Sequence, residues 1–215
     1  MRRLSRWDGR NGWHRCASAL LVVLFLAGPD VASVRAAEPE PEPSPTQVIE
    51  TLNTALLALM KVGPELDPHG RFDRIAPTIT ATHDLDFIAR FALGRYWDGL
   101  TEEQRGRYLA AFRDLSIATY ASRFNAFEGE RFRVVSEEML SNGDARVRSV
   151  LSTGDGDEVA FEYRLRRRDG PWRIINIEVD GVSDLALKRS EYTGVMHREG
   201  IAGLLARMEG KRRPH

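Results

Sequence analysis

The stretch that decides the fold is WRIINIEVDGVSDLALKRSEY, residues 172–192. It begins as a strand, because Ile174, Ile175, Ile177 and Val179 are β-branched, and the residues after it have helical character. Successive side chains of a strand point to opposite faces of the sheet. On a regular strand these four residues would make both faces apolar, so something other than water must cover part of the second face.

Three further runs with a period of two residues precede this strand. They cover residues 131–138, 145–152 and 158–168, and they are separated by Asn142-Gly143 and by the loop TGDGD. Asp169-Gly170 leads into the fourth run, at residues 171–179. Asn-Gly and Asp-Gly between alternating runs are typical of β-hairpins. The pattern therefore predicts a four-stranded antiparallel meander.

Two-residue turns, and a middle hairpin whose apolar positions align, assign the two faces of this sheet. One face is apolar throughout: Phe132, Val134, Val147, Leu151, Val159, Phe161, Tyr163, Leu165, Trp172 and Ile174. The other combines seven arginines with a second apolar set: Val135, Val150, Ala160, Ile175, Ile177 and Val179. We therefore expect helices to cover parts of both faces.

Apolar residues at helical spacing flank the strands on both sides. They predict helices over residues 46–62, 86–96, 101–127, 183–198 and 201–208. Thr101 and Gln104 form a capping-box pattern, and GPELDPHG (63–70) interrupts the chain after the first helix. Helices, then paired strands, then helices indicate one α+β domain over residues 46–209.

The N-terminal residues predict export. Five arginines precede the apolar run 16–28, and Val34-Arg35-Ala36 fits a cleavage site, so residues 1–36 are interpreted as a secretory signal peptide. An uncleaved membrane anchor is the less favoured alternative, because the apolar run is short. Residues 37–45 form a Pro/Glu-rich linker, and residues 210–215 form a basic tail.

The mature chain is expected to be mildly acidic. Six of the 31 Lys and Arg residues and two of the 31 Asp and Glu residues lie in the predicted signal peptide, which leaves 25 against 29. This balance argues against nucleic acid as a partner. The single cysteine, Cys16, also lies in that segment, so the mature chain would have no disulfide, thiol nucleophile or thiolate metal site.

The sequence holds few candidates for catalysis. It contains no phosphate-binding glycine loop, no G-x-S-x-G and no paired-histidine metal spacing. His83 with Asp84 and Asp86 could form an acid/base pair, although such aspartates more often cap a helix. Asn176, interpreted as lying beside Tyr163 on the apolar face, could contact a ligand or bond to that tyrosine.

Four arginines on paired strands predict a basic patch. Arg146, Arg148, Arg164 and Arg166 alternate along the chain, and Glu162 lies opposite Arg148. The patch could bind anionic lipid headgroups or an acidic partner. It could equally be an ordinary solvated sheet face.

The last third of the chain resembles a known family. The family pattern is Asp-Gly, Trp, a strand, Asp-Gly-Val-Ser, and a helix with Arg-Ser and an aromatic residue. It occurs here at Asp169, Gly170, Trp172, Asp180, Gly181, Val182, Ser183, Arg189, Ser190 and Tyr192. Upstream, FIARFALGRYWDGLTEEQRGRYLAAF (87–112) and TYASRF (119–124) also match. Together, over about residues 45–208, these features are similar to the MlaC and toluene-tolerance family of periplasmic phospholipid-binding proteins, and most similar to its hopanoid-associated branch, HpnM.

The chain departs from the family pattern at three places. Asn176 stands where relatives commonly have Asp, and Lys188 stands where many have Tyr. Residues 184–186 replace a more apolar run. These differences bear on the ligand and on the partner surface rather than on the fold.

The resemblance implies a periplasmic carrier rather than an enzyme. Its ligand would be a phospholipid or hopanoid-type lipid, held in an apolar cavity of an NTF2-like type of cone, with no cofactor or metal. The carrier would be a monomer that passes lipid between an inner-membrane ABC transporter complex and an outer-membrane lipoprotein complex. The residues that we expect to contact the ligand are Phe87, Phe91, Trp97, Phe112, Tyr120, Phe124, Phe132, Val147, Leu151, Phe161, Tyr163 and Ile174.

Two alternatives stay open. One is an enzyme of cone-shaped α+β fold that acts on a small apolar substrate through His83 or an aspartate. The other is an adaptor that docks to an envelope complex through the arginine face, and this alternative expects a filled core without a cavity.

Overall fold

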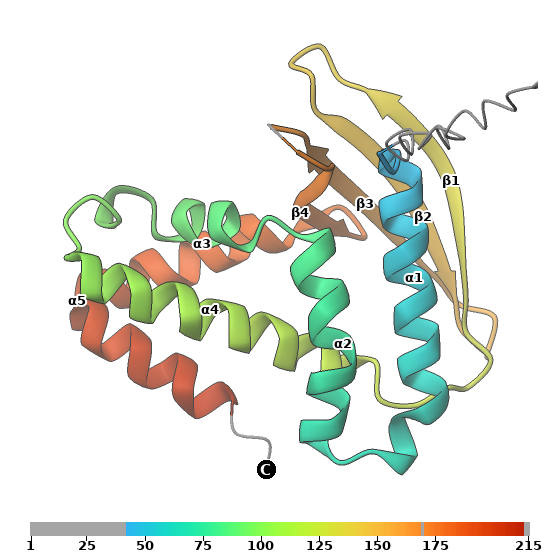
Figure 1. Cartoon of the computed structure of the whole chain (residues 1–215), viewed down its shortest axis with the longest axis horizontal. Coiled ribbons are helices and arrows are strands. Elements are labelled where there is room, and N and C mark those ends of the chain that lie inside the picture. The colour runs from blue at the N-terminus through green and yellow to red at the C-terminus, as the bar shows by residue number, and fades with distance from the viewer. Residues whose placement is uncertain (1–41, 169, 213–215) are drawn as a thin grey trace, which may run out of the picture. The chain divides into compact units, whose positions relative to one another are not determined.

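The computed structural model describes residues 42–168 and 170–212. The predicted signal peptide, residues 37–41 of the linker, Asp169 and residues 213–215 lie outside this part of the chain. The order of elements is α1 (Pro45–Val62), η1 (Gly63–Glu65), α2 (Pro68–Thr82), α3 (Leu85–Leu93), η2 (Gly94–Tyr96), α4 (Glu102–Arg123), β1 (Arg131–Met139), β2 (Ala145–Ser152), β3 (Glu158–Arg166), β4 (Arg173–Val179), β5 (Val182–Ser183) and α5 (Asp184–Arg212). Within residues 42–168 and 170–212, none of the helices is long and apolar enough to cross a membrane. The predicted α+β class is confirmed (Figure 1).

The predicted helix starts rest on side-chain caps. The Ser44 hydroxyl accepts a hydrogen bond from the backbone N–H of Gln47, and the Gln47 side chain accepts from the backbone N–H of Ser44. Thr101 and Gln104 make the same reciprocal pair at the start of α4. Each capping box satisfies two backbone donors that the first turn leaves free, so these two helices begin where the sequence predicts.

The helix α2 was not predicted. Residues 63–70 contain two prolines and two glycines, and the sequence there was interpreted only as a break. Pro68 occupies the first helical turn, where no backbone N–H is needed, and the Asp67 carboxylate accepts a hydrogen bond from the N–H of Gly70. The helix then continues through Pro77 and buries Ile75 and Ile79. The break is therefore only the short turn before α2.

The sheet is an antiparallel meander of five strands in the order β1-β2-β3-β4-β5. The four predicted strands are present, and the fifth, β5, adds two residues beside the end of β4. Phe132 faces Leu151, Val147 faces Tyr163, and Tyr163 faces Ile177. The helices pack on the face that carries Tyr163, and α1 lies along it in Figure 1.

A β-bulge in β4 explains the apolar residues on both sides of the regular pleat. Leu165 pairs with Ile174 and Arg164 pairs with Asn176, so Ile175 is an extra residue in β4. The bulge returns Ile177 and Val179 to the face of Tyr163. The prediction that Ile175, Ile177 and Val179 belong to the opposite face is therefore wrong, because it assumed regular alternation. Val135, which was predicted on the same face, is likewise the extra residue at a register shift in β1 and is 50% exposed.

An aromatic cluster joins α4 to α5. The Tyr108 ring lies 6.1 Å from Phe112 and 6.4 Å from Tyr192, and the Tyr108 hydroxyl donates to the carbonyl of Ala89 on α3. The backbone of α5 leaves the helical conformation at Gly200, whose φ of 65° favours glycine, so this element consists of two helical segments, as the sequence predicts. The helices α3, α4 and α5 thus form one packed layer.

Candidate functional site

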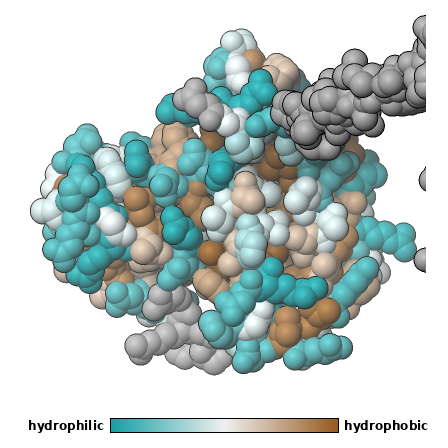
Figure 2. Space-filling model, viewed as in Figure 1, coloured by the Kyte–Doolittle hydropathy of each residue, from teal (hydrophilic) through white to brown (hydrophobic). Residues whose placement is uncertain are grey.

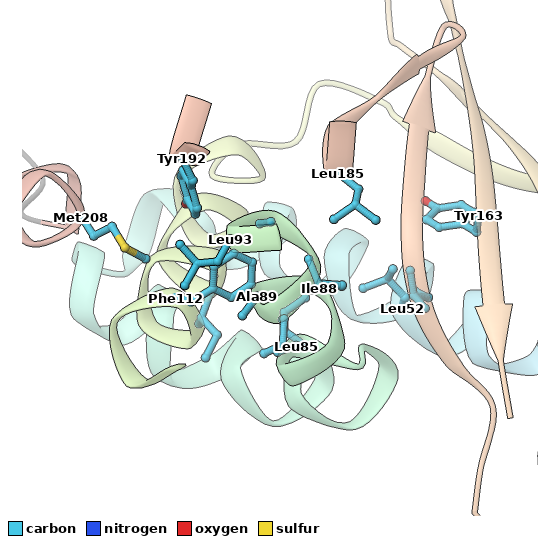
Figure 3. Packing of buried hydrophobic residues seen from close by; sticks show 14 of the residues in the cluster. Leu52, Leu85, Ile88, Ala89, Leu93, Phe112, Tyr163, Leu185, Tyr192 and Met208 are labelled. Carbon is cyan, nitrogen blue, oxygen red and sulfur yellow. The ribbon is translucent and has the colours of Figure 1, made fainter. Parts of the chain in front are cut away.

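A cavity of about 210 Å³ lies between the sheet and the helices. Its apolar walls come from α1, α3, α4, α5 and the face of the sheet that carries Tyr163: Leu56, Leu85, Ile88, Phe112, Phe124, Phe161, Tyr163, Ile175, Ile177, Val179 and Leu185. Figure 3 shows Ile88 and Leu185 on the helical side and Tyr163 on the strand side. In Figure 2 hydrophilic and hydrophobic side chains are interspersed on the visible surface.

The two ends of the cavity differ. At one end the backbone N–H of Asp84 donates to the carbonyl of Ile174 at 2.9 Å, which ties the junction of α2 and α3 to β4. At the other end Phe124 and Val179 are half-buried and Arg123 is exposed to solvent. We call this second end, formed by Arg123, Phe124 and Val179, the mouth. Aliphatic and aromatic groups thus lead inward from a polar rim.

Rings line one side of the cavity from helix to sheet. Tyr120 stacks on Phe124 with centroids 6.1 Å apart, and Phe161 stacks on Tyr163 at 5.9 Å. Phe132 bridges the two pairs, 6.4 Å from Phe124 and 6.2 Å from Phe161. Such contacts bury a large apolar area with few rotatable bonds, so they present a firm apolar wall.

Five of the twelve predicted ligand-contacting residues line this cavity: Phe112, Tyr120, Phe124, Phe161 and Tyr163. Phe132 adjoins it through the ring contacts above. Val147, Leu151 and Ile174 are buried in the core on the same face of the sheet, outside the cavity wall. Whether any of these residues contacts a ligand stays a prediction.

The other three predicted residues lie away from the cavity, against guanidinium groups. Phe87 packs under Arg166 at 4.9 Å, Phe91 under Arg189 at 4.6 Å. Trp97 lies between two arginines of α3 and α4, Arg90 and Arg105. Cation–π contacts of this kind occupy the ring faces, so they give these aromatics a structural role.

The sequence interpretation missed seven aliphatic residues of the wall. They are Leu56, Leu85, Ile88, Ile175, Ile177, Val179 and Leu185. Helical periodicity already marks the helical members as buried, but it does not separate a cavity wall from a filled core. The three strand members, Ile175, Ile177 and Val179, could be placed only with knowledge of the bulge.

The buried ring of His83 has a defined tautomer. Thr82 Oγ1 donates its proton to the carbonyl of Thr78, so at 2.9 Å it accepts from His83 Nδ1. The carbonyl of Ile79 is a second acceptor for the same nitrogen. His83 Nε2 therefore carries no proton in the neutral ring and accepts from the Tyr120 hydroxyl at 2.9 Å.

This environment keeps the imidazole uncharged. Burial lowers the pKa of His83 from 6.5 to about 4, opposed by the Ile79 carbonyl and by Asp184, while Lys188 lowers it further. Burial also raises the pKa of the Tyr120 hydroxyl well above 10. Asp84 caps α3 by accepting from the N–H of Phe87. The hydrogen bonds of His83 thus go to Thr82, Ile79 and Tyr120 rather than to the aspartates of the predicted acid/base pair.

Asn176 caps the start of α5. Its side-chain carbonyl accepts from Ser183 Oγ at 2.9 Å and from the backbone N–H of Leu185 at 3.4 Å. Because of the bulge it pairs with Arg164, while Tyr163 pairs with Ile177. The expectation that Asn176 lies beside Tyr163 is therefore wrong, although its side chain does reach the cavity wall.

Carboxylates neutralise most of the predicted basic patch. Arg146 Nε and Arg148 Nε lie 2.8 Å and 2.9 Å from the two oxygens of Glu162. Arg164 and Arg166 both bind Asp144, whose side chain is 3% exposed, at 2.8 Å and 2.9 Å. Hydrogen bonds from Arg166 and then Arg164 lower the pKa of Asp144 from 3.8 to about 2, against the opposing effect of burial. This face is a network of ion pairs rather than a free cationic surface.

A larger groove of about 790 Å³ runs along α2 and α4. Charged and titratable side chains contribute to its wall: Asp67, His69, Arg71, Asp114, Arg123 and Lys211. An apolar chain there would displace water from charged groups, which is costly. The smaller cavity is also lined by Arg123, Asp184 and Lys188, but aliphatic and aromatic residues make up most of its wall, so it is the better site for an apolar ligand.

Solved structures and relatives place this fold among known proteins. The structure of a phospholipid-binding protein from Ralstonia solanacearum, in complex with a phospholipid, matches with a TM-score of 0.68 over 77% of this chain and 94% of that one. The two sequences are 23% identical, so this likeness establishes the fold.

Two characterised relatives match at similar identity. The intermembrane phospholipid transport system binding protein MlaC of Haemophilus influenzae is 23% identical over 130 residues, which are 59% of this chain and 61% of that protein. The toluene tolerance protein of Pseudomonas putida is 22% identical over 161 residues, which are 73% of this chain and 75% of that protein. The sequence model of the family described as MlaC protein matches residues 50–210. That match covers about three quarters of the sequence, so this chain belongs to the MlaC family.

Proposed function

We propose that this protein binds a phospholipid in the cavity and carries it through the periplasm. The observation that carries the proposal is an aliphatic and aromatic cavity between sheet and helices, open at a polar mouth. Family membership supports it, because the relatives above are described as phospholipid transport and phospholipid-binding proteins. We further propose that the carrier is monomeric and exchanges lipid with an inner-membrane ABC transporter complex and an outer-membrane lipoprotein complex.

Apolar burial alone supplies enough binding energy. At roughly 0.8 kcal/mol per methylene, two long acyl chains contribute about 20 kcal/mol when they leave water. No covalent or metal-dependent step is needed for such binding. The cargo is held by shape and by the exclusion of water.

The cavity must widen to accept two acyl chains. Its volume of about 210 Å³ is below the roughly 300–1,000 Å³ of pockets that hold drug-sized ligands. Hydrogen bonds hold β1 to β4 together, whereas the helices meet the sheet mainly through side chains. The helical layer is therefore the part that we expect to move.

The geometry of His83 favours a carrier over the enzyme alternative. Both ring nitrogens already have protein partners, and the low pKa keeps the ring neutral. A general base needs an accessible nitrogen that gains a proton near the working pH. The adaptor alternative is less favoured because it expects a filled core.

Filling the cavity tests the proposal. Ile177→Trp places a large ring in the cavity, and Val135→Trp places the same ring at an exposed strand position outside the cavity wall as a matched control. Delipidated protein is incubated with vesicles of phosphatidylethanolamine and phosphatidylglycerol, and bound lipid is counted by native mass spectrometry.

Wild type and Val135→Trp should each take up one diacyl lipid. Ile177→Trp should bind at least about tenfold more weakly, because displacing two methylenes already costs that much. Equal uptake by Ile177→Trp, with circular dichroism confirming its fold, would place the lipid elsewhere. A parallel incubation with a hopanoid tests the second cargo expected from the HpnM-like pattern.

A further inference from the structure

Arg123 is an unusual cation for its position. It lies between the stacked Tyr120 and Phe124 in the sequence, is exposed to solvent, and lines the cavity beside Phe124. Within residues 42–168 and 170–212 it makes no hydrogen bond or ion pair, whereas the arginines of the sheet face bind carboxylates. Its guanidinium donors are therefore available at the end where a lipid would leave the protein.

A second cation faces the same cavity from α5. Lys188 lines the cavity with 26% of its side chain exposed and forms an ion pair with Asp184, one helical turn before it. Arg123 is close enough to influence Tyr120, and Lys188 is close enough to influence His83. Because Tyr120 and His83 share a hydrogen bond, the two cations flank one buried polar pair.

We propose that Arg123, assisted by Lys188, binds the phosphate group of the lipid whose tails fill the cavity. This inference rests on the proposed function. Arginine binds phosphate oxygens with two parallel N–H donors, and lysine adds a mobile point charge. The carboxylate of Asp184 opposes the phosphate and competes for Lys188, so Arg123 makes the larger contribution.

The location of Arg123 favours a lipid phosphate over a free phosphate ester. In a diacyl phospholipid the phosphate follows directly after the two tails. With the tails between Phe124, Phe161 and Val179, the phosphate emerges at the mouth. A free ester would lack the apolar contacts and would meet a single unpaired guanidinium in water, where such contacts are weak.

The test compares two lipids with the same tails. Delipidated protein is incubated with micelles of a non-ionic detergent that contain dioleoylphosphatidylglycerol and dioleoylglycerol in equal amounts. Native mass spectrometry gives the ratio of the two bound lipids. Wild type should prefer the phosphate-bearing lipid.

Arg123→Gln should lower this preference roughly tenfold, which is the low end expected for a hydrogen bond to a charged group. Lys188→Gln should lower it less, and Asp184→Asn should raise it because the repulsion is removed. Arg107→Gln, which removes an exposed arginine of the same helix outside the cavity wall, should leave it unchanged. If these residues acted only in folding, Asp184→Asn and Arg123→Gln would not change the lipid preference in opposite directions.

Three results would overturn the proposal. Equal ratios for Arg123→Gln and Arg107→Gln refute the phosphate site, while uptake of both lipids leaves the carrier function standing. Loss of the preference when millimolar glycerol 3-phosphate is added assigns Arg123 to a free phosphate ester. Failure of wild type to bind either lipid refutes the proposed function itself.

Discussion

The buried imidazole of His83 should make the stability of this protein depend on pH between about 7 and 4. Its pKa is about 4 in the native protein, against 6.5 for an exposed histidine, mainly because burial disfavours the charged ring. The unfolded chain therefore binds the proton more tightly, so the free energy of unfolding falls as the pH drops below 6.5. The loss is complete below pH 4.

The size of the effect follows from the two pKa values. At 1.36 kcal/mol per pKa unit, the difference between 6.5 and about 4 corresponds to about 3 kcal/mol at the acid limit. About 2 kcal/mol of this is lost between pH 7.5 and pH 5.0. Urea unfolding followed by circular dichroism at these two pH values measures it directly.

A pair of variants assigns the effect to this residue. His83→Phe removes the titrating ring, so it should flatten the loss between pH 7.5 and pH 5.0. It should also cost about 1–3 kcal/mol at pH 7.5, because the Tyr120 hydroxyl loses its acceptor. His69→Phe removes a ring whose side chain is 83% exposed and should keep the wild-type pH dependence. A loss in His83→Phe as large as in wild type would refute the buried, neutral histidine.

Two other stability predictions use matched pairs in urea unfolding. Asp144→Asn should lower the free energy of unfolding by about 2 kcal/mol, because two guanidinium groups lose a buried counter-charge. Its control, Glu138→Gln, removes a carboxylate from an exposed ion pair and should cost under about 1 kcal/mol. Equal costs for the two variants would contradict the special role of the buried carboxylate. Gly63→Ala should destabilise by roughly 1–3 kcal/mol, because its Cβ would lie 2.1 Å from the carbonyl oxygen of Asn125. Gly106→Ala, at an exposed helical position where the added Cβ meets nothing within 4 Å, should instead stabilise the protein by about 0.5–1 kcal/mol. If Gly63→Ala also stabilised the protein, the backbone around Gly63 and Asn125 would have to move apart without cost, which contradicts the predicted clash.

Local signals in the sequence predicted most of the fold. Asn142-Gly143 lies in the turn of a hairpin, and the Thr101–Gln104 pair starts α4, because both depend on neighbouring residues only. The predicted turn lengths of two residues are wrong, because three residues separate Leu140 from its partner Asp144 and six separate Arg166 from Arg173. The helix α2 shows the limit of that reasoning. Proline and glycine usually interrupt helices, but Asp67 and Pro68 together make a helix start, and only tertiary packing of Ile75 and Ile79 decides the outcome.

The candidate site was harder to predict than the fold. Its wall depends on the bulge at Ile175, and nothing in alternating side chains marks an extra residue in a strand that is apolar at four positions. The aromatics of α3 illustrate a second limit. Hydrophobic spacing predicts that Phe87 and Phe91 are buried, yet both rings lie against arginines that are distant in sequence.

The contacts at its two ends determine how the cavity can widen. The backbone bond from Asp84 to Ile174 fastens the α2–α3 junction to β4, and the buried His83–Tyr120 bond ties α4 to the same point. At the mouth, Phe124 meets Phe132 only through apolar ring contact, which can slide without breaking a hydrogen bond. Opening should therefore pivot about His83 and separate α4 from the sheet at Phe124. A lipid that enters this way goes in tails first and leaves its polar end beside Arg123, so the fold itself sets the orientation of the cargo.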